Sequence, residues 1–223
     1  YEYFEGQNRA LQGVEPGSVV KPISMMIALE EGITTPERSW NGHGGKWNFQ
    51  GKDIRDSHPC GSLTANEVIE KSSNIGMAGI ILHGYTQKSG KKPSDFRKDL
   101  EKHGFFEPLN LGLKGEQKPR YKNLDTSDSP LLDLSRMAFG YTTFIPPIYT
   151  LAMYNAFAND GLLVAPHLVK KLMRKNEPDS IISPRTWRVC SEKNAKALRY
   201  MLHQVVWGKS GTAGCLRDDR IEI

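Results

Sequence analysis

Three short groups of polar residues in this chain could together make a serine reactive. Ser18 precedes Lys21 by three residues, and on a helix that spacing places two side chains on one face, about 5–6 Å apart at Cβ. A serine hydroxyl is a poor nucleophile until a base within hydrogen-bond reach takes its proton. Lys21 could be that base if burial and a neighbouring cation lower its pKa. The stretch therefore suits acyl transfer, although a serine at the start of a helix is also a favoured cap.

The two other groups supply what such a reaction needs next. Ser72 could pass a proton to a leaving amine, and Asn74 could bind a substrate peptide bond. Lys209 is the candidate cation beside Lys21, and together with the hydroxyls of Ser210 and Thr212 it could hold a carboxylate. A strand here would also offer backbone amides for an oxyanion hole. Each group taken alone is typical of a turn, a loop or a surface lysine.

Caps and apolar spacing predict the helices that must position these groups. The first motif (Ser18–Lys21) begins a helix that runs to about Glu31 and ends at Gly32. A capping box, Thr64 to Glu67, predicts a short helix that ends just before Ser72. Further helices are expected over 75–82, 94–103 and 148–159, and from Ser191 or Asn194 onward.

The rest of the chain is predicted as loops and strands. Residues 33–62 look irregular with one hairpin, 109–130 look mostly like loop, and 162–173 look like strand, turn and strand. The third motif (Lys209–Thr212) is expected on a strand. The last helix would then pass into that strand without loop residues, so we expect residues to be missing between Val206 and Trp207.

Composition excludes several classes of protein. The chain has 223 residues, 38% of them hydrophobic and 25% charged, with a net charge of +5. No apolar run approaches the roughly 20 residues that cross a bilayer. The three cysteines and six histidines show no zinc spacing. The one dense basic run, 88–98, also contains acids and turn formers, so nucleic-acid binding is not predicted, whereas a carboxylate-bearing substrate suits the charge.

The three motifs in this order are the signature of the penicillin-recognising serine acyltransferases. The chain resembles the transpeptidase domain of a class B penicillin-binding protein over most of residues 14–214, in the stretches "EPGSVVKP", "IRDSHPCGSLTANEVIEKSSNIGM", "MAFGYTTFIPPIYTLAMYNAFANDGLLVAPHLVKK" and "WGKSGTA". Glu-Pro-Gly-Ser before the nucleophile and Ser-Ser-Asn as the second motif (residues 72–74) are most like the division-specific, septal type.

The resemblance implies an α+β transpeptidase fold, an antiparallel sheet flanked by helices. Residues 1–223 would form one transpeptidase domain, with 33–160 contributing an all-helical part. Only eleven residues follow Thr212, so the C-terminal strands of the family fold are expected to be truncated or missing. The membrane anchor and the N-terminal pedestal domain are likewise expected to lie outside this chain.

The same resemblance implies a peptidoglycan D,D-transpeptidase that crosslinks stem peptides ending in D-Ala-D-Ala and is acylated by β-lactams. It would be anchored in the bacterial inner membrane with its catalytic domain on the periplasmic side, beside membrane-bound division proteins, and would need neither a metal nor an organic cofactor. The amides of Ser18 and Thr212 would form the oxyanion hole. The implied catalytic residues are Ser18, Lys21, Ser72, Asn74 and Lys209, with Ser210, Gly211 and Thr212 binding substrate.

Three alternatives share the fold. A class A serine β-lactamase would carry a Glu-x-x-x-Asn segment between the second and third motifs, and we find none. A β-lactam-sensing receptor domain would be acylated without turnover, and the septal-type stretches argue against it. A scaffold without chemistry would not need the intact polar residues of the three motifs.

Overall fold

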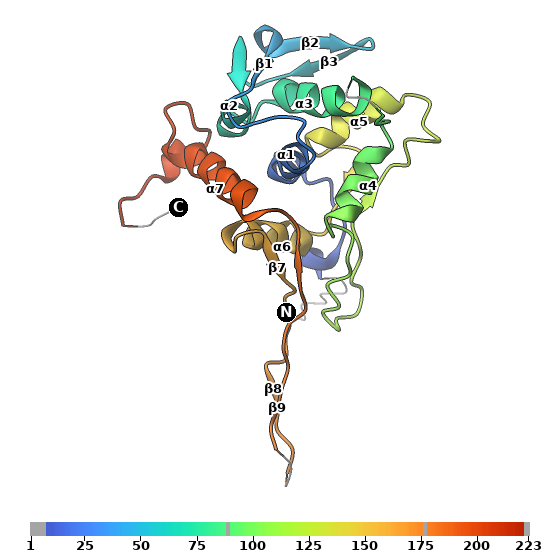
Figure 1. The fold of residues 1–223 in the computed structure, drawn as a ribbon, viewed down its shortest axis with the longest axis vertical. Coiled ribbons are helices and arrows are strands. Elements are labelled where there is room, and N and C mark those ends of the chain that lie inside the picture. Colours follow the sequence, from blue (N-terminus) through green and yellow to red (C-terminus); the bar gives the residue numbers. More distant parts are fainter. Residues whose placement is uncertain (1–7, 88–89, 176–177, 221–223) are drawn as a thin grey trace, which may run out of the picture.

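The helix that follows Ser18 lies at the centre of the molecule. The computed structural model describes residues 8–87, 90–175 and 178–220. In it the predicted helix begins as a 3-10 turn, η2 (Gly17–Val20), and continues as α1 (Lys21–Glu30), of which every residue but Glu30 is buried. Helices α3 and α5 lie above α1, α6 below it, and α7 and α4 to its sides (Figure 1). The first motif is therefore anchored in the hydrophobic core.

The helices predicted from their caps are present. Thr64 forms the expected capping box with Glu67 at the start of α2 (Ala65–Glu70), and the Ser191 hydroxyl caps α7 (Glu192–Trp207) by accepting from the Asn194 amide. These caps satisfy amides that the first turn of a helix leaves unpaired. The remaining predicted helices also lie close to their expected ranges: α3 (Asn74–Thr86), α4 (Asp95–Lys102) and α6 (Pro147–Ala158).

One helix, α5 (Pro130–Ala138), was not predicted. It begins at a proline that follows Ser129, a usual first residue for a helix because proline lacks the amide that would be unpaired there. Helix α5 packs against α3 and leads into the loop that reaches back to the turn before α1. Residues 109–129 are mostly loop, as predicted, with one short strand.

The strands pair two at a time, and every pair is antiparallel. With the helices they make the α+β architecture that the resemblance implies, but 33–160 is not all-helical as expected, because strands β1 to β6 lie within it. The hairpin β2–β3 pairs Trp47 with Ile54 and passes over the outer face of α3 (Figure 1). The pairs are β1 (Ser39–Asn41) with β4 (Ser62–Thr64), β2 (Lys46–Phe49) with β3 (Lys52–Arg55), β5 (Arg120–Tyr121) with β6 (Thr143–Phe144), β7 (Leu162–Val164) with β10 (Thr186–Arg188), and β8 (Lys171–Leu172) with β9 (Ser180–Ile181).

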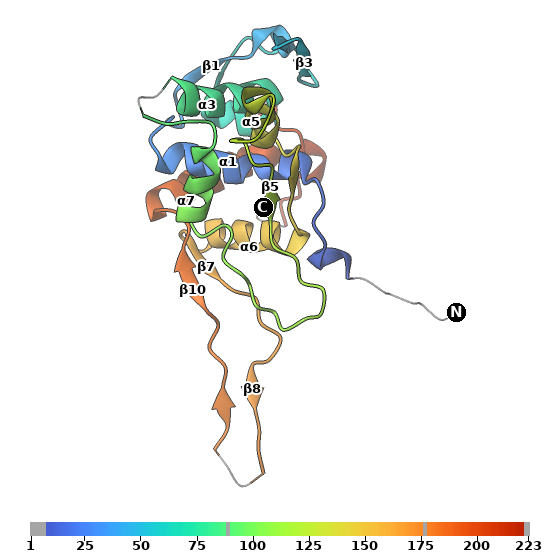
Figure 2. The same cartoon turned by 90° about the vertical axis from the view of Figure 1, so that its right-hand side faces the viewer.

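Of the strand predictions, the one for 162–173 is confirmed and the one for the third motif is wrong. Strands β7 and β8 lie within 162–173, and their partners β10 and β9 come later in the chain. The β8–β9 hairpin forms an arm that extends beyond the helices (Figure 2). The third motif is not a strand: α7 runs without a break through Trp207, and residues 209–212 form turns. No residues are therefore needed between Val206 and Trp207 to connect these elements.

In the described ranges no helix has the length and apolarity that crossing a membrane would require.

Candidate active site

Ser18 lies in the turn before α1, and its side chain is exposed. The neighbouring Gly17 donates its amide to the carbonyl oxygen of Gly140 at 3.1 Å, which fixes this turn against the loop after α5. The Ser18 Oγ accepts a hydrogen bond from Lys21 Nζ at 3.1 Å, the contact that their spacing predicts. The expectation that Ser18 also caps the helix is wrong, because Pro16 occupies the cap position and no side chain caps this end.

Lys21 is a buried lysine, only 2% exposed, and its amine connects the first motif to the second. Besides the Ser18 hydroxyl, Nζ contacts the Ser72 Oγ at 2.9 Å and the Ser72 carbonyl oxygen. Burial lowers the pKa of Lys21 from 10.5 to about 8, and the charge of Asp56 acts in the opposite direction. A lysine in this state can exist as a neutral amine near neutral pH, which a general base requires.

The second motif forms a strained turn between α2 and α3. Ser72 has a φ of +53°, a left-handed conformation that a residue with a Cβ rarely adopts. Ser73 caps α3 by accepting from the Gly76 amide at 2.8 Å. Asn74 is the first residue of α3, and its Nδ2 donates to the Arg55 carbonyl oxygen at 2.9 Å. This bond orients the side-chain amide of Asn74 and leaves its Oδ1 to accept a hydrogen bond from a substrate N–H.

Asp56, which the sequence analysis did not single out, holds this turn in place. Its carboxylate accepts from the Ser73 hydroxyl at 2.6 Å, from the Asn74 amide at 2.6 Å and from the Ile75 amide at 3.1 Å. No local pattern could have identified it, because it belongs to the segment after β3 and meets α3 only in the folded chain.

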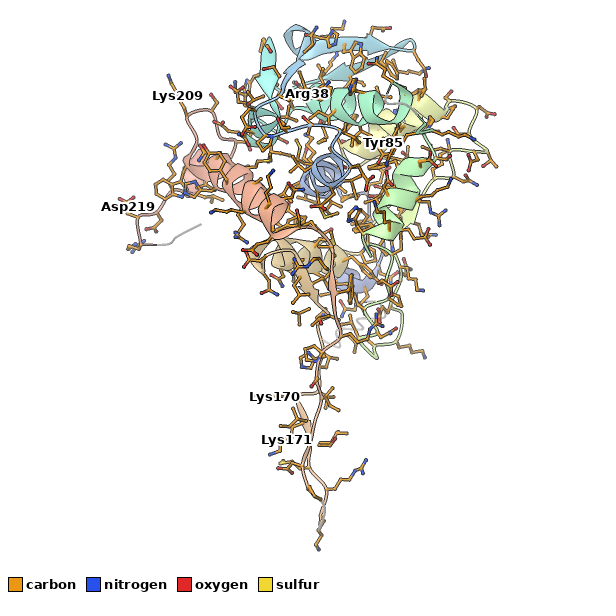
Figure 3. All side chains as sticks on the ribbon, viewed as in Figure 1. Arg38, Tyr85, Lys170, Lys171, Lys209 and Asp219 are labelled. Carbon is orange, nitrogen blue, oxygen red and sulfur yellow. The ribbon has the colours of Figure 1, made fainter. Side chains whose placement is uncertain are left out.

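The third motif lies against α2, and in the part of the chain that the structure describes it makes no hydrogen bond or ion pair with Ser18 or Lys21. Lys209 is exposed at the edge of the molecule (Figure 3). The prediction that it lowers the pKa of Lys21 is wrong, since burial alone does so. The Thr212 amide, expected in the oxyanion hole, instead donates to the Glu70 carbonyl oxygen at 3.3 Å. Within the described residues no neighbouring strand pairs with this segment, and its backbone amides at Ser210 and Thr212 donate to Glu70 of α2 instead.

A pocket of about 480 Å³ separates the third motif from the residues before the second. Ser210, Gly211 and Thr212 line one side, and Asp56 and Lys71 are among the residues that line the other. Hydroxyls and one ammonium facing a cavity can bind an anionic group such as a carboxylate. Over the described ranges, no three His, Cys, Asp or Glu side chains gather as a metal site would require.

Comparison with known proteins identifies the family to which the chain is similar. The model of the penicillin-binding protein transpeptidase domain family matches residues 3–222. A curated relative from Pseudomonas aeruginosa, named probable peptidoglycan D,D-transpeptidase PbpC, is 32% identical over 206 residues. That match covers 92% of this chain but 33% of the relative, so the chain spans about a third of the relative's length.

Solved structures show the same fold. The transpeptidase domain of penicillin-binding protein 3 from Burkholderia pseudomallei matches 94% of this chain and 58% of its own, with a TM-score of 0.75 and 28% identity. Penicillin-binding protein 3 from Mycobacterium tuberculosis, solved in complex with aztreonam, matches 96% of this chain and 44% of its own, with a TM-score of 0.74 and 25% identity. The likeness therefore covers nearly all of this chain and about half of each compared structure.

Proposed function

The chain belongs to the penicillin-binding protein transpeptidase family, and we propose that it is a serine D,D-transpeptidase that forms an acyl-enzyme on Ser18. One observation carries the proposal. The Lys21 amine lies 3.1 Å from the Ser18 hydroxyl and 2.9 Å from the Ser72 hydroxyl, so a base joins a nucleophile to a proton donor. Ser18 itself is exposed to an incoming substrate.

The geometry supports the following steps. Neutral Lys21 takes the Ser18 proton as Ser18 Oγ forms a bond to the carbonyl carbon of the penultimate D-Ala. The carbon–nitrogen bond of D-Ala-D-Ala then breaks, and its nitrogen receives a proton from Lys21 by way of the Ser72 hydroxyl. The terminal D-Ala leaves. The amine nitrogen of a second stem peptide then forms a bond to the ester carbon and passes its proton through the Ser72 hydroxyl to Lys21. The ester carbon–oxygen bond breaks, and Lys21 returns a proton to Ser18 Oγ, which restores the Ser18 hydroxyl.

Substrate binding is assigned to the second and third motifs. Asn74 Oδ1 would accept from a peptide N–H of the donor strand. Lys209 would attract the terminal carboxylate, and Ser210, Gly211 and Thr212 would contact it. Ser210, Gly211 and Thr212 line a pocket of about 480 Å³ that Lys71 also lines, which supports their part of this assignment.

The proposal extends to the whole protein of which this chain corresponds to a part. Residues 1–223 act as one transpeptidase domain in septal peptidoglycan synthesis, on the periplasmic side of the inner membrane, with an anchor and division partners outside this chain. Glu-Pro-Gly-Ser at 15–18 and Ser-Ser-Asn at 72–74 support the septal role. The aztreonam complex of the M. tuberculosis protein supports acylation of Ser18 by β-lactams.

Brief incubation with benzylpenicillin, followed by intact mass spectrometry over hours, tests the function. We expect one stable adduct on the parent chain and on Ser39→Ala, which alters an exposed serine in β1, and no adduct on Ser18→Ala. Loss of the Ser18 hydroxyl leaves no atom to form the ester, while the fold should be kept.

Each other result contradicts a stated part of the proposal. An adduct on Ser18→Ala would reject Ser18 as the nucleophile. An adduct that disappears within seconds while the drug is consumed would assign the chain to the serine β-lactamases instead. A folded parent chain that forms no adduct would reject acylation of this chain.

A further inference from the structure

Asp56 makes three hydrogen bonds to the first residues of α3. Oδ2 accepts from the Ser73 hydroxyl at 2.6 Å, and Oδ1 accepts from the amides of Asn74 and Ile75 at 2.6 Å and 3.1 Å. The start of a helix has unpaired amides and a partial positive charge, so a carboxylate is favoured there. The Ser73 hydroxyl also accepts from the Gly76 amide at 2.8 Å, which uses both its proton and a lone pair.

These bonds determine where Ser72 can lie. On its C-terminal side the chain is held by Asp56. On its N-terminal side the Ser72 amide donates to the Ile69 carbonyl oxygen at 3.0 Å and the Ser73 amide to the Val68 carbonyl oxygen at 2.9 Å. A positive φ at a serine is unfavourable unless its surroundings enforce it. The enforced turn directs both the carbonyl oxygen and the hydroxyl of Ser72 at Lys21 Nζ.

The negative charge of Asp56 also acts on Lys21. Its charge favours the ammonium form of Lys21 and so opposes the effect of burial. Other charged groups on the elements around α1 have partners of their own, are exposed, or lie at the far end of α1. They are Glu30 and Glu31 on α1, Glu67, Glu70 and Lys71 beside α2, His83 on α3, Glu192, Lys193, Lys196, Arg199 and His203 on α7, and Lys209 after it.

We propose that Asp56 is a positioning residue for acyl transfer, which holds the second motif against Lys21 and supplies the counter-charge that lets Lys21 alternate between amine and ammonium. The inference rests on the proposed function for its catalytic part. Its electrostatic part concerns Lys21 itself and can be measured without any reaction.

The first test is the titration of Lys21 by NMR. Protein labelled with ¹³C-lysine is titrated from about pH 6 to about pH 11, and the Lys21 signal is identified by its absence in Lys21→Met. We expect Asp56→Asn to lower the midpoint for Lys21, because the ammonium loses its counter-charge. Asp53→Asn is the matched control: it removes an exposed carboxylate of the same hairpin that pairs with Lys46 and Arg55, and the midpoint should not move.

The second test separates position from charge. Ser73→Ala removes the hydroxyl that Asp56 holds but keeps the carboxylate. We expect its Lys21 midpoint to equal that of the parent, while benzylpenicillin acylation slows by roughly 10- to 100-fold because Ser72 is no longer held in place. In Asp56→Asn we expect both the slower acylation and a pH profile displaced to lower pH.

The possible results are distinct. A folded Asp56→Asn protein with an unchanged Lys21 midpoint overturns the counter-charge role. Parent-like acylation of Ser73→Ala overturns the positioning role, and this variant decides the matter if Asp56→Asn does not fold. A parent chain that is never acylated rejects the proposed function and with it the catalytic part, whereas the titration still tests the electrostatic part.

Discussion

At the scale of single residues, Lys21 combines two requirements that oppose each other. A base must be neutral for part of the time, and burial achieves this by lowering its pKa to about 8. At pH 7 roughly a tenth of such a group is unprotonated. The same burial makes the ammonium form costly in the folded state, because a charge removed from water is only partly compensated by the serine oxygens and the charge of Asp56.

This cost predicts a pH-dependent difference in stability between the parent and Lys21→Met. The folded pKa of about 8 lies below the ordinary 10.5, so the unfolded state binds the proton more tightly. The penalty is complete below pH 8 and disappears as the pH rises to 10.5. Urea unfolding should show Lys21→Met gaining up to about 3 kcal/mol over the parent at pH 7.

The advantage of Lys21→Met should then shrink above pH 8. Parallel stability profiles for the two proteins between about pH 7 and pH 10.5 would contradict a depressed lysine pKa.

Sequence reasoning identified contacts within one helix but not those made by folding. The pairing of Ser18 with Lys21 follows from helical spacing alone, and in the structure Lys21 Nζ donates a hydrogen bond to Ser18 Oγ at 3.1 Å. The prediction that Lys209 lies beside Lys21 and lowers its pKa was wrong, because it assumed a strand, and a strand needs a partner strand beside it. Asp56 was missed because the hairpin that brings it to α3 is a tertiary arrangement, with no signal at fixed spacing.

At the scale of elements, the predictions that succeeded concerned boundaries set by nearby residues. The capping box at Thr64, the cap at Ser191 and the positive φ of Gly32 all act within a few residues. Strands β7 and β8 were predicted but their partners β10 and β9 were not, because a strand's partner is chosen across the chain.

The loop after α5 constrains the turn that carries Ser18. Gly140 has a φ of +94°, and a Cβ added to it would lie 2.0 Å from the Gly17 carbonyl oxygen. Gly140→Ala must therefore displace the residue just before Ser18. We expect benzylpenicillin acylation to fall by roughly 10- to 100-fold.

Gly115→Ala is the matched control for this prediction. Gly115 has a similar φ of +88°, but its added Cβ would approach nothing closer than 3.7 Å. Both variants should lose about 1–3 kcal/mol of stability through backbone strain, and Gly115→Ala should keep its acylation rate. Equal acylation by the two variants would show that the contact with Gly17 does not position Ser18.

At the scale of the whole molecule, two adjacent glutamates at the end of α1 connect it to α4 and α7. Glu30 accepts from the amide and hydroxyl of Ser191 at 2.8 Å and 2.7 Å, which ties α1 to the start of α7. Glu31 pairs with Lys91, Lys102 and His103 at 2.8 Å, 2.8 Å and 3.1 Å. Partly buried ion networks of this kind are costly to break because they leave charges without partners.

Glu31 therefore predicts sensitivity to acid. Although burial opposes it, hydrogen bonds from Lys102, Lys91 and His103 lower the pKa of Glu31 from 4.5 to about 2. Its contribution is present above pH 4.5 and is lost as the pH falls from 4.5 toward 2. By urea unfolding, Glu31→Gln should be less stable than the parent by about 2 kcal/mol at pH 7.

The difference in stability between the parent and Glu31→Gln should be smaller at pH 3 than at pH 7. Glu37→Gln, at an exposed position, controls for loss of a glutamate charge and should match the parent at both pH values. A stability difference that stays constant down to pH 3 would show that the ionised Glu31 carboxylate does not cause it.

The β8–β9 arm is the covalent connection between two parts of the molecule that also contact each other through helix packing. The backbone that carries Ser18 and Ser72 reaches the third motif only by passing through this arm, whose strands pair with each other and whose side chains at Lys171 and Leu172 are exposed. Helix α7 meanwhile packs directly on α1, α2 and α6. A chain cut at the arm would thus become two fragments held together by helix packing, each carrying a different part of the proposed active site.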